Sequence, residues 1–170
     1  GTELSRYKIQ DLQSEVSNLQ IEQQSTVLTY LLAENLDTEE RCAAQNILSE
    51  QNLGDLYDVR KQLEQNRNSR KIEDPRYRDL KSRYLLTLIE NYLRRQSLES
   101  GCTNQTVEVL YFHQDKCESC DGQGRILTGL RQDYSNSLLV YPIDSDYSLE
   151  PISFLEEYHG VESYPTVIVE

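Results

Sequence analysis

The stretch Val107–Cys120, which reads VEVLYFHQDKCESC, decides how the C-terminal part of this chain folds. Its first six residues, Val107–Phe112, form an apolar run with the length and composition of a buried strand. Cys117 and Cys120 follow, with two residues between them, where a helix is expected to begin. At a helix start, unpaired backbone N–H groups and the helix dipole favour a thiolate on the first cysteine. The spacing therefore predicts a redox-active dithiol, with Cys117 as the nucleophile and Cys120 as the resolving thiol.

Two other interpretations of this cysteine pair stay open. The same spacing supplies half of a zinc site, but His113 is the only nearby candidate for a further ligand and His159 lies far along the chain. A purely structural disulfide between Cys117 and Cys120 would close a very short loop, and stabilisation by loop closure grows with loop length. We prefer the redox interpretation, and we expect neither a metal nor another cofactor.

Further apolar segments follow the dithiol. Residues 138–144 are predicted to form a second buried strand, and a short helix is expected through Phe154 and Tyr158. Residues 160–169 contain a Tyr-Pro-Thr sequence and then a third apolar strand. With a dithiol and a proline loop in this order, Val107–Val169 resembles the thioredoxin superfamily.

The resemblance implies a fold, an activity and a set of site residues. Residues 101–170 would form an α/β thioredoxin-like domain. Pro165 would be cis and would lie against the dithiol, and Tyr164 would face the substrate. The implied function is thiol–disulfide exchange on protein substrates, with a separate redox partner protein and no cofactor.

Four features depart from the family pattern. The residues before the dithiol, 113–116, include no tryptophan, and Tyr111 stands where the family has a buried carboxylate beneath the resolving cysteine. Gly122 and Gly124 lie in the first turns of the expected helix, where each costs about 1 kcal/mol relative to alanine. The chain also stops at Glu170, just after the proline strand, where the family adds a strand and a helix. Either the fold is truncated there, or the upstream helical region covers the exposed edge.

Residues 1–100 are predicted to form an all-α region of amphipathic helices. We interpret it as a scaffold for the redox domain, and a coiled coil, a dimerisation element or a substrate-binding arm is the alternative. We expect its first helix to carry a heptad-like stripe and then, after a polar interval, to continue its apolar face. A homodimer through these helices is one expected assembly. The stripe comprises Ile9, Leu12, Val16 and Leu19, and the continuation comprises Val27, Leu28, Leu31 and Leu32.

Two more helices are expected in this region. Asp37, followed by Glu40, predicts a capping box for the second helix, and Gly54 is expected to break it. A polar linker at residues 66–71 is followed by Asp74-Pro75, which we predict to open the third helix. The inner face of the third helix should comprise Tyr77, Leu80, Tyr84, Leu88 and Tyr92, and Gly101 should end it.

Composition and charge limit the choice of partners. The chain of 170 residues carries a net charge of -12, and residues 101–170 hold 3 basic against 12 acidic side chains. Because phosphate binding needs a basic surface, nucleic acid is not an expected partner. No stretch of 18 apolar residues is present, so any membrane anchor would lie outside this chain.

The chain begins at Gly1 and contains 4 cysteines and no methionine, which suggests a processed domain from an oxidising, extracytoplasmic compartment. There it would be periplasmic, secreted or membrane-tethered. Cys42 and Cys102 form a possible structural disulfide, which would link the helical region to the redox domain. The alternative is that Cys42 is a small buried apolar residue and Cys102 a free thiol.

Two functions stay open: a thiol–disulfide oxidoreductase, and a non-catalytic binding or scaffold module whose dithiol is structural. For the enzyme, charge predicts the redox direction. Asp115, Glu118 and Asp121 surround Cys117, with Lys116 as the neighbouring cation, so repulsion should raise the thiolate pKa. A reductase or isomerase is therefore expected rather than a strong oxidase.

Overall fold

The structure is a computed structural model that describes residues 2–67, 75–99, 101–102 and 106–170, with side chains at these positions except 2–5, 45–55, 66–67, 98–99 and 136. The chain divides into two compact units, Gly1–Cys102 and Thr103–Glu170. Cys102, which the sequence assigned to the second domain, belongs to the first unit. A helical region followed by a small α/β part, the coarse form of the expected fold, is confirmed.

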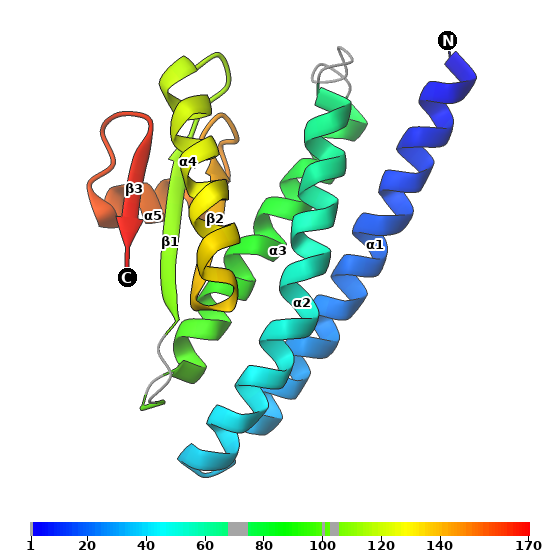
Figure 1. Cartoon of the computed structure of the whole chain (residues 1–170). Coiled ribbons are helices and arrows are strands. Elements are labelled where there is room, and N and C mark those ends of the chain that lie inside the picture. The colour runs from blue at the N-terminus through cyan, green and yellow to red at the C-terminus, as the bar shows by residue number, and fades with distance from the viewer. Residues whose placement is uncertain (1, 68–74, 100, 103–105) are drawn as a thin grey trace. The chain divides into compact units, whose positions relative to one another are not determined.

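The first unit is a bundle of three long helices, α1 (Thr2–Ala33), α2 (Thr38–Arg67) and α3 (Pro75–Glu99), each in contact with the other two (Figure 1). The buried residues of α1 recur at alternating intervals of three and four, which is the spacing of a heptad seam. The predicted inner face of α3 is buried as expected, and the Tyr77 hydroxyl donates to the Leu63 carbonyl of α2 at 2.9 Å. The seam of α1 comprises Ile9, Leu12, Val16, Leu19, Gln23, Thr26, Tyr30 and Ala33.

The predicted continuation of the α1 face is wrong. The seam keeps its period through Gln23 and Thr26, although both are polar, and the Thr26 hydroxyl is satisfied by the Glu22 carbonyl at 2.9 Å. The leucines that follow therefore fall outside the core, with Leu28 56% and Leu32 72% exposed. Helix register, rather than local hydrophobicity, decides which side chains of α1 are buried.

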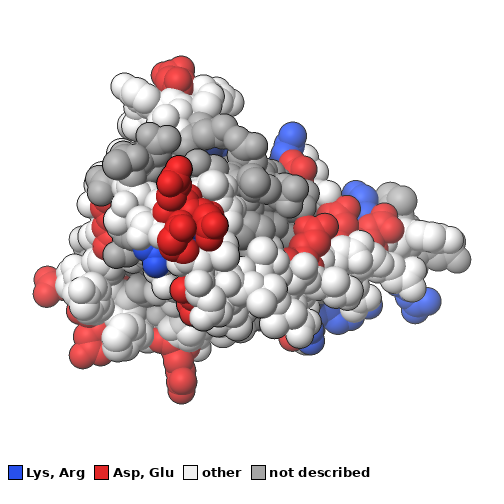
Figure 2. All heavy atoms as spheres, turned by 90° about the horizontal axis from the view of Figure 1, so that it is seen from below, with Lys and Arg blue, Asp and Glu red and all other residues white. Residues whose placement is uncertain are grey.

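Helix α2 begins where predicted but runs further than predicted. Asp37 Oδ1 accepts from the Glu40 backbone N–H at 2.8 Å, so the N-cap bond of the predicted capping box is confirmed. Acidic side chains gather at this end of the bundle, which Figure 2 views from below. Gly54 does not break the helix, because tertiary packing on both neighbouring helices outweighs a propensity cost of about 1 kcal/mol. The helix also runs into the expected linker as far as Arg67, whereas the rest of that linker and the Asp74 cap lie outside the described residues.

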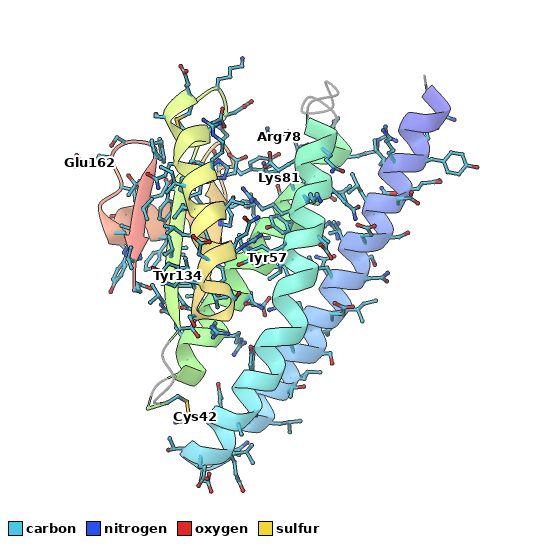
Figure 3. All side chains as sticks on the ribbon, viewed as in Figure 1. Cys42, Tyr57, Arg78, Lys81, Tyr134 and Glu162 are labelled. Atoms are coloured by element: carbon cyan, nitrogen blue, oxygen red, sulfur yellow. A yellow bond between two sulfur atoms is a disulfide. The ribbon has the colours of Figure 1, made fainter. Side chains whose placement is uncertain are left out.

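Cys42 and Cys102 form a disulfide with a Cα–Cα distance of 5.7 Å, as predicted; the Cys42 side chain is labelled in Figure 3. Its place in the fold corrects the prediction, because both cysteines belong to the first unit. The bond therefore ties the first turns of α2 to the residues after α3. Gly101, with a φ of +90°, adopts the left-handed backbone that glycine tolerates at a helix end.

The second unit is built on a three-stranded sheet with the order β2-β1-β3. The central strand β1 (Val107–His113) runs parallel to β2 (Leu138–Asp144) and antiparallel to β3 (Thr166–Val169). Between the strands lie α4 (Glu118–Tyr134), the short 3-10 helix η2 (Ser135–Ser137) and α5 (Glu150–His159). Figure 1 shows α4 in front of the strands and α5 behind them.

The core beneath α4 places the start of that helix at one end of the sheet. Leu127 of α4 packs with Val109 and Tyr111 of β1 and with Val140 of β2. Six of the seven residues of β1 are buried, including the polar Glu108 and His113, as expected for the central strand of a sheet. Because α4 follows β1 directly, its N-terminus lies beside the end of the central strand.

Candidate functional site

The two cysteines of the predicted dithiol lie at the N-terminus of α4 and form a disulfide with a Cα–Cα distance of 5.1 Å. Cys117 is the N-cap residue, with an extended backbone, and its Sγ accepts from the Cys120 backbone N–H at 3.1 Å. This donor is one of the N–H groups that a helix leaves without a partner at its start. Cys117 is half-buried, whereas Cys120 is 2% exposed, so the sulfur assigned as the nucleophile is the more accessible one.

Two further groups lie near the Cys117 sulfur. The Ser119 hydroxyl is 3.5 Å away and the Tyr164 carbonyl oxygen is 4.0 Å away. The fold thus brings together the dithiol and the proline loop, which are 47 residues apart in sequence. The Tyr164-Pro165 bond is cis, as predicted. Sequence reasoning missed Ser119, although a serine in the first turn of the helix could have suggested it.

The Tyr164 side chain is held by α5. Its hydroxyl donates to Glu156 Oε1 at 3.0 Å, so it is the backbone carbonyl of Tyr164 that lies near Cys117. Burial raises the pKa of the Tyr164 hydroxyl above its usual 10.0, and the Glu156 carboxylate raises it further. Glu156 was not predicted as a site residue, since nothing in the local sequence links it to Tyr164.

The loop before the dithiol is tied to the loop after β2. The Asp115 backbone N–H donates to Asp146 Oδ2 at 2.6 Å, and the Ser145 N–H donates to the His113 carbonyl at 2.8 Å. Lys116 has a φ of 52°, a left-handed conformation that is uncommon outside glycine. These contacts position the chain as it turns from β1 into α4, and the sequence alone did not predict them.

Two buried aromatic residues lie on β1 on the face that α4 covers. Tyr111 is 4% exposed, its hydroxyl donates to the Cys120 carbonyl, and its ring stacks on His113 with a centroid distance of 5.1 Å. Gly124 faces this ring, and a Cβ at its position would stand 3.6 Å from the hydroxyl, which is an ordinary van der Waals contact. The helix passes through Gly122 and Gly124 without interruption, so their propensity cost is overcome by packing on the sheet.

Charge at the dithiol acts in two directions. Glu118 and Asp121 are exposed on the first turn of α4. Their negative charges interact favourably with the positive end of the helix dipole, but they repel a thiolate on Cys117. The backbone N–H of Cys120 and the hydroxyl of Ser119 lie close enough to favour that thiolate. The carboxylates are exposed and screened by solvent, whereas the N–H group points directly at the sulfur.

Within residues 2–67, 75–99, 101–102 and 106–170, no cluster of three or more His, Cys, Asp or Glu side chains is arranged to hold a metal ion. None of the helices described combines the length and apolar character needed to cross a bilayer.

Comparison with known proteins adds little to this geometry. No family model matches the chain, and no curated protein matches it. A solved structure described as "Structure of a malarial protein" is similar over 39% of this chain and 70% of its own, at 29% sequence identity and a TM-score of 0.35. A TM-score this low carries no argument about fold or function.

Proposed function

We propose that this protein is a thiol–disulfide oxidoreductase that acts on protein thiols or disulfides through Cys117 and Cys120. One observation carries the proposal: a half-buried sulfur caps α4, accepts a backbone N–H at 3.1 Å and lies 4.0 Å from the Tyr164 carbonyl of the proline loop. A nucleophilic thiolate needs such a donor and such access.

The arrangement of the sheet supports a thioredoxin-like interpretation of residues 101–170. The central strand leads into the dithiol helix, its parallel neighbour follows that helix, and the antiparallel strand follows the proline loop. The order of dithiol and proline loop in the sequence agrees with it. Tyr164 and Pro165 are then the proposed substrate-binding residues, since an extended substrate at Cys117 would run beside them.

The reaction follows from the two sulfurs. In the reduced protein the Cys117 thiolate attacks a substrate disulfide, one substrate sulfur leaves as a thiolate, and a mixed disulfide forms on Cys117. Cys120 then loses its proton and attacks Cys117 Sγ, and the second substrate sulfur leaves and is protonated. Two electrons pass to the substrate, and a protein dithiol would have to reduce the Cys117–Cys120 bond again. The acidic neighbours of Cys117 favour this reducing or isomerising direction.

The alternative, a binding module with a structural dithiol, accounts less well for the site. A disulfide between residues three apart contributes roughly 1.6 kcal/mol in the chain-entropy model, against about 4 kcal/mol for the bond across 60 residues. A short, half-accessible bond is better suited to exchange than to stability.

Two disulfides are compatible with an oxidising compartment. We place the protein outside the cytoplasm, as a periplasmic, secreted or membrane-tethered enzyme. A chemical test of the compartment is the redox state of Cys42 and Cys102 in protein isolated under acid quench with a thiol-blocking reagent. Complete alkylation of both thiols would contradict this placement.

Reduction of insulin by dithiothreitol tests the activity. Wild type should accelerate the precipitation of insulin chains, Cys117→Ser should not, and Cys120→Ser should accumulate a mixed disulfide with its substrate. The matched control is Cys42→Ala with Cys102→Ala, assayed where it remains folded; it removes the other bond and should keep the activity. A wild-type rate equal to the Cys117→Ser rate would favour the structural module instead.

A further inference from the structure

The hydroxyl of Tyr111 makes a contact that the exchange reaction described above does not explain. It donates to the carbonyl oxygen of Cys120 and so joins the central strand directly to the first turn of α4. The side chain is 4% exposed, and His113 supports its ring by stacking. A buried hydroxyl that bonds to the backbone of a cysteine in the site points to a role in placing that cysteine.

Cys120 is held through both polar groups of its backbone. Its N–H donates to Cys117 Sγ at 3.1 Å, and its carbonyl accepts from Tyr111. Gly124, on the next turn of the helix, faces the Tyr111 ring, and a Cβ at its position would be in ordinary contact with the ring atoms at 3.6 and 3.7 Å. The backbone of the buried Cys120 is thus held at its N–H by Cys117 and at its carbonyl by Tyr111 of the sheet.

We propose that Tyr111 is a positioning residue that keeps Cys120 aligned for its attack on the mixed disulfide, an inference that rests on the proposed function. While the mixed disulfide exists, the Cys117–Cys120 bond is open and only non-covalent contacts hold Cys120 in place. Cys120 loses its proton to solvent and its Sγ bonds to Cys117 Sγ as the substrate sulfur leaves. The rate of such an intramolecular step depends strongly on the alignment of the reacting atoms.

Glutathione disulfide provides a simple probe of this step. Reduced Cys117 attacks it, releases one glutathione and retains the other as a mixed disulfide, which Cys120 resolves by releasing the second. Acid quenching followed by mass spectrometry measures the lifetime of the mixed disulfide. Tyr111→Phe keeps the aromatic ring but removes the donor, and it should slow resolution by roughly tenfold.

Three measurements separate positioning from a general structural effect. The attack of Cys117 on glutathione disulfide, measured in a Cys120→Ser background, should change less than threefold when Tyr111→Phe is added. Tyr141→Phe is the matched control, because it removes another buried tyrosine hydroxyl of the same sheet, which donates to Glu108 Oε1 at 3.2 Å. Gly124→Ala, which leaves the Tyr111 hydrogen bond in place, should resolve at the wild-type rate.

The outcomes distinguish this inference from the proposed function. If the wild type forms no mixed disulfide with glutathione disulfide or insulin, the proposed function fails. If the wild type exchanges but Tyr111→Phe resolves at the wild-type rate, only the role of Tyr111 is overturned. Equal slowing by Tyr111→Phe and Tyr141→Phe, or equal slowing of attack and resolution, would also overturn it, since either result reports a loss of general stability.

Discussion

Removal of the Cys42–Cys102 bond should strongly destabilise the helical unit. The bond joins residues 60 apart, and its Cα–Cα distance of 5.7 Å lies within the usual range for disulfides. For a loop of this length the chain-entropy model gives a contribution of about 4 kcal/mol, because the bond restricts an unfolded segment that contains all of α3 and most of α2. We expect the variant Cys42→Ala with Cys102→Ala to lose this amount.

Urea unfolding followed by circular dichroism at 222 nm measures the loss. With a slope of about 2 kcal/mol per molar urea, a loss of about 4 kcal/mol lowers the midpoint by about 2 M. Because the chain has two compact units, hydrogen exchange on α2 and α3 should assign the change to the bundle. The control variant, Cys117→Ala with Cys120→Ala, should shift the midpoint of the bundle far less.

A small shift would refute this reasoning. If the wild type contains the bond by peptide mapping and the variant midpoint moves by less than about 0.5 M, the unfolded segment is already restricted without it. Alkylation of Cys42 in the native, unreduced protein would refute the pairing itself.

Three further predictions concern the second unit. Gly129→Ala should stabilise the protein by about 0.5–1 kcal/mol, since no atom lies within 4 Å of the added Cβ in α4. Gly160→Ala should destabilise it by about 1 kcal/mol because the φ of Gly160 is +66°. Thermal unfolding of the two variants checks both predictions. The pKa of Tyr164 is raised in the folded state, so its contribution to stability is complete below the unfolded value near 10.0 and is lost as pH rises through the folded value. Urea midpoints should therefore fall more steeply above pH 10 in the wild type than in Tyr164→Phe, and equal slopes would contradict the shift. The dithiol should equilibrate with glutathione at a potential nearer about -270 mV than about -120 mV, and a Cys117 thiol pKa well below about 6 would indicate an oxidase instead.

Much of the site could be predicted from local spacing. The apolar run of β1, the cysteines at the start of α4 and the Asp37 cap each depend on residues within a few positions of one another. Periodicity likewise predicted the buried face of α3. The Cys42–Cys102 pairing was predicted because few cysteines were available to pair, and it lies in the first unit rather than between the two.

Other features depend on contacts between residues far apart in sequence. Asp115 reaches Asp146 because the loops after β1 and β2 converge at one end of the sheet. Tyr164 lies near Cys117 across 47 residues, a contact that the family resemblance had implied. No local pattern encodes these distances.

Helices α1 and α2 show the same contrast between what the local sequence predicts and what tertiary packing determines. Apolar content alone placed Leu28 and Leu32 in the core, and intrinsic propensity alone placed a break at Gly54. The heptad register of α1 turns those leucines toward solvent, and packing on α1 and α3 carries α2 through the glycine. The sequence by itself determined which segments form helices, strands and the dithiol turn. The tertiary structure alone decided which face of α1 is buried after Leu19 and which polar side chains, Tyr111 and Ser119, contact the dithiol segment, because burial and alignment are properties of the packed chain rather than of any segment within it.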